Sequence, residues 1–203
     1  PNLLYCTNSP SIYPGDPLLV QRLRLSAIEH GFHITVRLHQ ADREERWSHL
    51  SNSPYLTLYA PSHSRSASHN ISASSTHLSS LHDQISASSV VICSYSTIFY
   101  DALSLNKHCI NLGFDPSDSP TTYPINRADK FCHLQPFLTS PFVHTVRNYS
   151  DLLRLVLFYS MHPSDALYSK RVESFIRFLL PHNFRVSSLS RLSRIIISAS
   201  HIV

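Results

Sequence analysis

Glycine is scarce in this sequence, and the phosphate-binding motifs that depend on it are missing. Only 3 of the 203 residues are Gly. Neither G-x-G-x-x-G nor G-x-x-x-x-G-K-[ST] occurs, and each of these motifs needs glycine so that backbone N–H groups can approach a phosphate. Their absence argues against a dinucleotide-dependent oxidoreductase and against a P-loop NTPase.

Metal-binding and acidic patterns are missing as well. The sequence has no Asp-x-Asp motif and no cluster with metal-ligand spacing, so we expect neither a metal ion nor a cofactor. Residues 7–12 hold no carboxylate, which argues against a flavodoxin-like regulatory domain. The cysteines lack C-x-x-C spacing, so we expect reduced core residues of a cytosolic protein. They are Cys6, Cys93, Cys109 and Cys132.

Charge and long apolar runs are also limited. Charged residues make up 15% of the chain, and no apolar stretch approaches the ~18 residues of a membrane span. No signal-like start is visible, and the chain begins with Pro rather than Met, so we expect a piece of a longer protein. The net charge is +4, with arginines gathered in the C-terminal third: Arg171, Arg177, Arg185, Arg191 and Arg194.

A solvated helix face is the favoured interpretation of these arginines. Peripheral contact with the inner face of the membrane is the alternative, and no nucleic-acid partner is expected. The protein is predicted to be cytoplasmic.

Apolar runs alternate with helical periods along most of the chain. Hydrophobic residues make up 42% of the sequence, an ordinary globular share that predicts a folded chain, and 203 residues fit one domain, or one and a half. The expected strands are 2–6, 33–38, 56–60, 89–93, 108–113 and 143–146. Such alternation predicts an α/β fold, with a Rossmann-like parallel sheet and helices on both faces.

Capping residues predict where the helices begin. Asp16 before Pro17 opens a helix that Gly31 ends, and Asp42 with Glu45 forms a variant capping box. Further helices are expected at 78–85, 97–105, 151–161 with Ser150 as cap, 165–180 with Ser164 as cap, and 186–200. Residues 61–76 form a loop or a frayed helix start, and 116–141 form a connection without secondary structure.

The tetrapeptide Ser94-Tyr95-Ser96-Thr97 stands where a strand passes into a helix. Ligands of open parallel sheets bind at the carboxyl ends of the strands, where the free N–H groups of helix N-termini favour anions. Small hydroxyl residues add donors without blocking a phosphate, so the segment is interpreted as a phosphate cradle. The alternative is that Ser96 only caps the helix.

The stretch around this tetrapeptide resembles the nucleotide-binding C-terminal domain of GT-B glycosyltransferases. The resemblance is closest to the bacterial surface-carbohydrate group, which includes CDP-glycerol glycerophosphotransferases, CMP-dependent sialyltransferases and UDP-N-acetylglucosamine 2-epimerase-like proteins. It is carried by Ser96–Thr97, Asp101–Ala102 and Asn106–Lys107–His108, where His108 replaces the usual Pro. A second match, VRLHQADREERW at 36–47, resembles an Arg-x-His-Pro segment, with Gln40 in place of Pro.

This resemblance implies roles for particular residues. His39 would be catalytic, because an imidazole near the phosphates can stabilise a leaving group. The phosphates would be bound by Ser94, Ser96 and Thr97, with backbone N–H groups of Asn8 and Ser9 approaching from the loop 7–16. Asp115 would bind a ribose or donor hydroxyl, or else only cap its loop before Pro116.

The resemblance implies the donor-binding half of a glycosyltransferase. Residues 1–147 would bind a nucleotide sugar, and residues 148–203 would be closing helices. The implied partners are a CMP-, CDP- or UDP-activated sugar or polyol phosphate, a polysaccharide or glycolipid acceptor of the cell surface, and a missing N-terminal GT-B domain that supplies the general base. The alternatives are a non-catalytic remnant, a nucleotide-sugar-binding module, and an epimerase-like enzyme that would use Asp101 and Asp115.

Overall fold

A single parallel sheet organises the molecule. The computed structural model describes residues 1–50, 54–60, 75–115, 132–162 and 164–179, and within them six parallel strands lie in the order β3-β2-β1-β4-β5-β6. The strands are β1 (Asn2–Cys6), β2 (His33–Arg37), β3 (Leu56–Tyr59), β4 (Val90–Cys93), β5 (His108–Leu112) and β6 (Val143–Val146). The predicted Rossmann-like α/β fold is confirmed.

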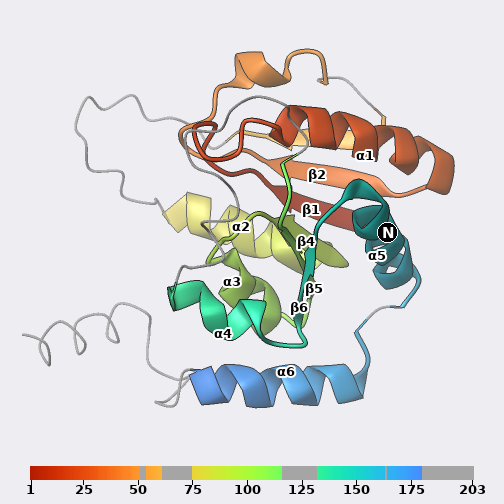
Figure 1. Ribbon diagram of the computed structural model, residues 1–203. Coiled ribbons are helices and arrows are strands. Elements are labelled where there is room, and N and C mark those ends of the chain that lie inside the picture. The colour runs from red at the N-terminus through yellow and green to blue at the C-terminus, as the bar shows by residue number, and fades with distance from the viewer. Residues whose placement is uncertain (51–53, 61–74, 116–131, 163, 180–203) are drawn as a thin grey trace, which may run out of the picture.

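Helices cover both faces of this sheet (Figure 1). They are α1 (Asp16–His30), η1 (Glu44–Trp47), α2 (Ser75–Ala87), α3 (Ile98–Ser104), η3 (Cys132–Leu134), α4 (Gln135–Leu138), α5 (Tyr149–Met161) and α6 (Ala166–Leu179). Side chains of α1, η1 and α5 share one core with the sheet, and those of α2, α3, α4 and α6 share the other.

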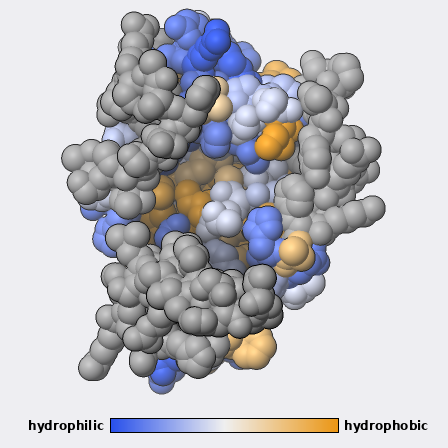
Figure 2. Space-filling model, turned by 90° about the vertical axis from the view of Figure 1, so that its left-hand side faces the viewer, coloured by the Kyte–Doolittle hydropathy of each residue, from blue (hydrophilic) through white to orange (hydrophobic). Residues whose placement is uncertain are grey.

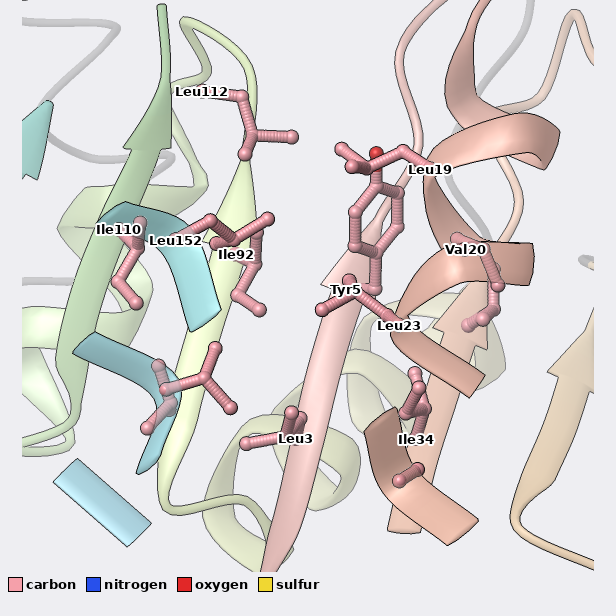
Figure 3. Packing of buried hydrophobic residues seen from close by; sticks show 14 of the residues in the cluster. Leu3, Tyr5, Leu19, Val20, Leu23, Ile34, Ile92, Ile110, Leu112 and Leu152 are labelled. Atoms are coloured by element: carbon pink, nitrogen blue, oxygen red, sulfur yellow. The ribbon is translucent and has the colours of Figure 1, made fainter. Parts of the chain in front are cut away.

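Successive side chains of the central strands point to opposite faces of the sheet and so contribute to both cores. Leu3 and Tyr5 of β1 point to the face covered by α1 and α5, whereas Leu4 and Cys6 point to the opposite face. All four are buried, which explains why this strand is a continuous apolar run. Figure 3 shows side chains of the first core meeting between the strands and the two helices. Full burial of a large apolar side chain stabilises the fold by ~1.5–3 kcal/mol.

The second core contains three of the four free cysteines. Cys6, Cys93 and Cys109 are buried thiols, as predicted. Cys132 is exposed, so the expectation that it is a core residue is wrong. It begins the short helix η3, which with α4 lies in the connection predicted to lack secondary structure.

Two predicted caps are replaced by other arrangements. Gly15 is the N-cap of α1, and Asp16 is its first residue, buried with its carboxylate turned toward β1. Instead of an α-helix with a capping box, residues Glu44–Trp47 form one 3₁₀ turn. The reason is that the Asp42 carboxylate accepts from Arg46 Nη1 at 2.6 Å and from Trp47 Nε1 at 3.0 Å, which ties it to the far end of the turn.

Two further caps also differ from the prediction. The Asn148 side chain, not Ser150, caps α5 by accepting from Asp151 N. The Asp165 carboxylate accepts from Tyr168 N at the start of α6, while the Ser164 hydroxyl donates to the Asn106 carbonyl. The helix predicted at 186–200 and segment 61–74 lie outside the described residues.

No helix among the described residues combines the length and the apolar character that crossing a membrane requires.

Candidate functional site

The strand order places a switch point between β1 and β4. The chain builds outward from β1 to β2 and β3, and then crosses back to β4 on the other side of β1. The loops that follow β1 and β4 therefore diverge, and a crevice at such a point is the usual ligand site of an open parallel sheet. Figure 2 shows this carboxyl-end side of the molecule, where apolar residues lie in a hollow with polar residues beside it.

The β1–α1 junction uses its polar groups internally. The N–H of Asn8 donates to Asp16 Oδ2 at 3.0 Å, and the N–H of Ser9 donates to Asn8 Oδ1 at 2.8 Å. Asn8 Nδ2 donates across the switch point to the carbonyl oxygen of Ser94 at 2.8 Å. A phosphate at Asn8 and Ser9 would have to replace the first two of these bonds.

Asp16 is the acceptor that organises this junction. It is 1% exposed, and its Oδ1 accepts from the hydroxyl of Tyr5 at 2.6 Å. Burial raises the pKa of this carboxyl to about 8, although the hydrogen bonds from Tyr5 and Asn8 favour the ionised form. The protonated form of Asp16 therefore persists to a higher pH than that of an ordinary Asp.

The β4–α3 junction begins with two residues that are fixed by the sheet. The buried hydroxyl of Ser94 donates to the carbonyl of Leu112 in β5 at 3.1 Å. Tyr95 has a φ of 45°, a left-handed conformation that is uncommon outside glycine. Its N–H is held by Asn111 Oδ1 at 2.7 Å, and this bond compensates the strain.

The next two residues of this junction are less constrained. Ser96 is half-buried, and its hydroxyl oxygen accepts from the N–H of Ile98 at 3.3 Å. Thr97 is exposed and is the N-cap of α3, but its side chain makes no capping bond. The Ser96 hydroxyl also bonds to the thiol of Cys93, whereas the Thr97 hydroxyl keeps a donor hydrogen that can turn toward a ligand.

His39 follows β2 and lies beside the β1 end. Its backbone N–H donates to Thr7 Oγ1 at 2.7 Å, and its Nδ1 accepts from the N–H of Ala41 at 3.1 Å. Because Nδ1 is an acceptor, the neutral ring carries its proton on Nε2. Partial burial lowers the pKa of His39, against the attraction of the Asp42 charge. At pH 7 the ring is thus a neutral donor.

Asp115 follows β5, one strand beyond β4 in the sheet. Its Oδ2 is buried, so the carboxylate is not turned freely to solvent. Next to it, the hydroxyl of Tyr13 donates to the carbonyl of Phe114 at 2.5 Å and ties the β1–α1 loop to the end of β5. Asn8 and Ser94 are therefore in direct contact, while His39 and Asp115 lie on opposite sides of the switch point.

Three supporting residues were not predicted from the sequence: Thr7, which fixes His39; Tyr13, which ties two loops; and Asn111, which fixes Tyr95. Asn111 is fully buried in the apolar run CINLGF. An amide in such a run is a signal for a buried hydrogen bond, because burying it unpaired is costly. In the described part of the chain, no group of three or more His, Cys, Asp or Glu side chains is arranged to hold a metal ion.

No protein-family model matches the sequence, and no curated protein sequence matches it. Two solved structures share its fold. The ADP-heptose LPS heptosyltransferase II of E. coli has a TM-score of 0.50 at 14% identity, covering 79% of this chain and 46% of that one. S. aureus MnaA, solved with UDP, has a TM-score of 0.50 at 11% identity, covering 92% and 47%. The chain spans about half the length of each, and this likeness shows a Rossmann-like fold of the GT-B type.

Proposed function

We propose that this chain is the donor-binding half of a GT-B glycosyltransferase and binds the phosphates of a nucleotide-activated sugar or polyol phosphate at the β4–α3 junction. The observation that carries the proposal is the position of Ser96 and Thr97. They follow β4 at the switch point, where the exposed Thr97 hydroxyl keeps its donor hydrogen and the Ser96 hydroxyl bonds to the Cys93 thiol and to the N–H of Ile98.

The two structural relatives support this class of donor. One is named for ADP-heptose and the other was solved with UDP. Both names carry a nucleoside diphosphate, so ADP joins the CMP, CDP and UDP types implied by the sequence resemblance. The acceptor, a polysaccharide or glycolipid of the cell surface, is part of the same proposal.

His39 is proposed to stabilise the leaving group. A neutral ring that holds its proton on Nε2 can donate a hydrogen bond to a departing phosphate oxygen. Helix α3 is only 7 residues long, so its dipole contributes little. Binding therefore depends on hydroxyl and imidazole donors, and we expect a weak Kd of roughly 0.1–1 mM for the isolated chain.

One observation favours a second candidate, a nucleotide-sugar-binding module without catalysis. Sugar transfer needs a general base with access to the acceptor hydroxyl. Asp16 has a pKa near neutrality, but it is buried and bonded to Tyr5. It is therefore out of reach and does not supply that base.

Calorimetric titration of UDP, CDP, CMP and ADP tests the proposal. One nucleotide should bind, and the variant Ser96→Ala/Thr97→Ala should weaken it by about 10-fold or more, because each hydrogen bond contributes ~1 kcal/mol. The matched control is Ser169→Ala/Ser174→Ala, which removes two exposed hydroxyls of α6 that bond only to their own helix. Equal affinity in both double variants would contradict the phosphate site.

A further inference from the structure

Four strand residues form a row across the sheet, near its carboxyl edge. Cys6 pairs with Cys93 in the strand register, and Cys93 pairs with Asn111. Asn111 pairs in turn with Thr145 of the edge strand β6. Side chains alternate along a strand, and the alternation places this row on the face whose core is shared with α2, α3, α4 and α6. The row therefore lies on the side of the sheet that α3 covers.

Three of the four residues at the β4–α3 junction are tied to strands that carry this row. Ser94 and Ser96 are held through their hydroxyls, by the Leu112 carbonyl of β5 and by the Cys93 thiol of β4. Tyr95 is held through its N–H. Thr97 differs, because it is exposed and its side chain makes no capping bond. The contacts before Thr97 therefore determine where its hydroxyl lies.

Tyr95 has the least favourable backbone of this junction. Its φ of 45° is left-handed, which is rare for a bulky side chain. Such a conformation persists only where its surroundings hold it. Two contacts do so: the ring is packed in the second core at 8% exposure, and Asn111 Oδ1 accepts from the N–H at 2.7 Å. The chain turns from β4 toward α3 at this residue, so its conformation sets the position of the residues that follow.

Asn111 is satisfied at both ends of its amide. It is 0% exposed, and its Nδ2 donates to Thr145 Oγ1 at 3.1 Å. The N–H of Tyr95 can only donate, so it selects the amide oxygen, and Thr145 takes the amide nitrogen. An aliphatic side chain would bury more favourably at this position. The amide therefore serves the two bonds rather than the core.

We infer that Asn111 is a positioning residue of the β4–α3 junction: it holds Tyr95 in the left-handed conformation and so places the Thr97 hydroxyl where it contacts a phosphate of the donor. The phosphate contact rests on the proposed function, whereas the fixing of Tyr95 does not. Through Thr145, the edge strand β6 is linked to the same junction.

Hydrogen exchange of backbone amides, followed by NMR on the full chain, tests the fixing of Tyr95. Asn111→Leu keeps a similar volume and removes both amide bonds. Exchange of the Tyr95 amide should accelerate by about 10-fold or more relative to the amides of β1, because its acceptor is lost. A general loss of stability would accelerate exchange in both places alike.

Variants of Thr145 give a milder test in a chain that keeps its shape. Thr145→Val removes only the hydroxyl and should accelerate the relative exchange of the Tyr95 amide by about 3-fold. Thr145→Ser keeps the hydroxyl and should exchange like the parent chain. Unchanged relative exchange in Asn111→Leu would overturn the inference. If that variant does not fold, the comparison of Thr145→Val with Thr145→Ser decides in the same way.

The matched control is Ser26→Ala. It removes a buried hydroxyl that bonds to the Tyr149 hydroxyl at 2.9 Å, between α1 and α5 on the opposite face of the sheet. This variant should lower stability while leaving the relative exchange of the Tyr95 amide unchanged.

Calorimetric titration of UDP and ADP tests the role in binding. Asn111→Leu should weaken binding of the nucleotide by about 5-fold or more, whereas Ser26→Ala should bind like the parent chain. Equal affinity of Asn111→Leu and the parent would overturn the positioning role and leave the proposed function intact. If the parent binds neither nucleotide, the proposed function loses its support and the contact of Thr97 with phosphate is refuted. The exchange measurement then decides alone whether Asn111 fixes the junction.

Discussion

The β1–α1 and β4–α3 junctions lie next to each other at the carboxyl edge of the sheet, but their polar groups have different partners. At β1–α1, the carboxylate of Asp16 stands in the first turn of the helix and accepts from the Asn8 N–H and the Tyr5 hydroxyl. At β4–α3, the acid of the first turn is Asp101, which is exposed and accepts no such bond among the described residues, and the Thr97 hydroxyl keeps its donor hydrogen.

Both junctions connect a strand to a helix, but the side chains of β1–α1 stabilise the fold, whereas the Thr97 hydroxyl of β4–α3 is available to bind a ligand. An acid at a helix N-terminus occupies the position that an anionic ligand would take. The β1–α1 junction is therefore closed by the side chain of Asp16, whereas no hydrogen bond among the described residues ties the Asp101 side chain to the β4–α3 junction. Variants at Asp16, Ser94, Ser96 and Thr97 test this difference between the two junctions.

The largest effect is expected for Asp16→Ala. This change leaves the buried Tyr5 hydroxyl and the Asn8 N–H without an acceptor, which should lower the free energy of unfolding by about 2–4 kcal/mol. Urea denaturation measures it. Asp83→Ala is the control, because the Asp83 side chain is 81% exposed, and it should change stability little. A loss below about 1 kcal/mol for Asp16→Ala would show that the junction is not held by this carboxyl.

The next effect is the change in the free energy of unfolding with pH. The pKa of Asp16 is about 8 in the folded state and 3.8 as an unperturbed group. The folded chain therefore retains a proton that the unfolded chain releases between these values, so stability from this group is present at low pH and decreases as pH rises from about 4 to 8.

Asp16→Asn removes this titration. The difference in unfolding free energy between the parent chain and Asp16→Asn should decrease from pH 5 to pH 8 and become constant above that. Urea denaturation at each pH gives this difference, and histidines and other groups common to both chains cancel. Parallel profiles over the whole range would show that the pKa of Asp16 is ordinary.

Much of the fold could be predicted because strands and helices have strong periodic patterns. The strands at 2–6, 33–38 and 108–113 were located to within a residue, since the first and the last contain buried apolar runs and the second alternates between apolar and polar residues. Helix starts were predicted less well. Asp16 and Ser164 have the residue types of caps, but their side chains bond to groups distant in sequence, Tyr5 and Asn106. Local patterns contain no information about such partners.

The site could be predicted only as a set of segments. Hydroxyl and imidazole residues after strands 1, 2 and 4 indicate the carboxyl edge. The engagement of Ser94 with Leu112, and of Asn8 with Ser94, depends on which strands are neighbours. That order is a tertiary property, so the roles of the candidate residues remain predictions for experiment.

A moderate effect is expected for Ser94→Ala. It removes the buried hydroxyl that donates to the Leu112 carbonyl and should lower stability by about 1 kcal/mol. Ser104→Ala is the matched control, because that exposed hydroxyl bonds only to its own helix. The two variants are compared by urea denaturation. If Ser94→Ala is as stable as its control, the hydroxyl of Ser94 is not needed by the sheet and becomes a candidate for ligand binding together with Ser96.

The smallest change in stability is expected for Ser96→Ala/Thr97→Ala. At a half-buried position Ser96 loses one long bond of 3.3 Å and a weak bond to the Cys93 thiol, and Thr97 loses no capping bond. The free energy of unfolding should fall by at most about 0.5 kcal/mol, typical of surface substitutions. The same variant should lose nucleotide affinity, so stability and binding separate at this junction. A stability loss as large as that of Ser94→Ala would mean that the hydroxyls of the β4–α3 junction serve the fold, as Asp16 does at β1–α1, and the contrast between the two junctions would disappear.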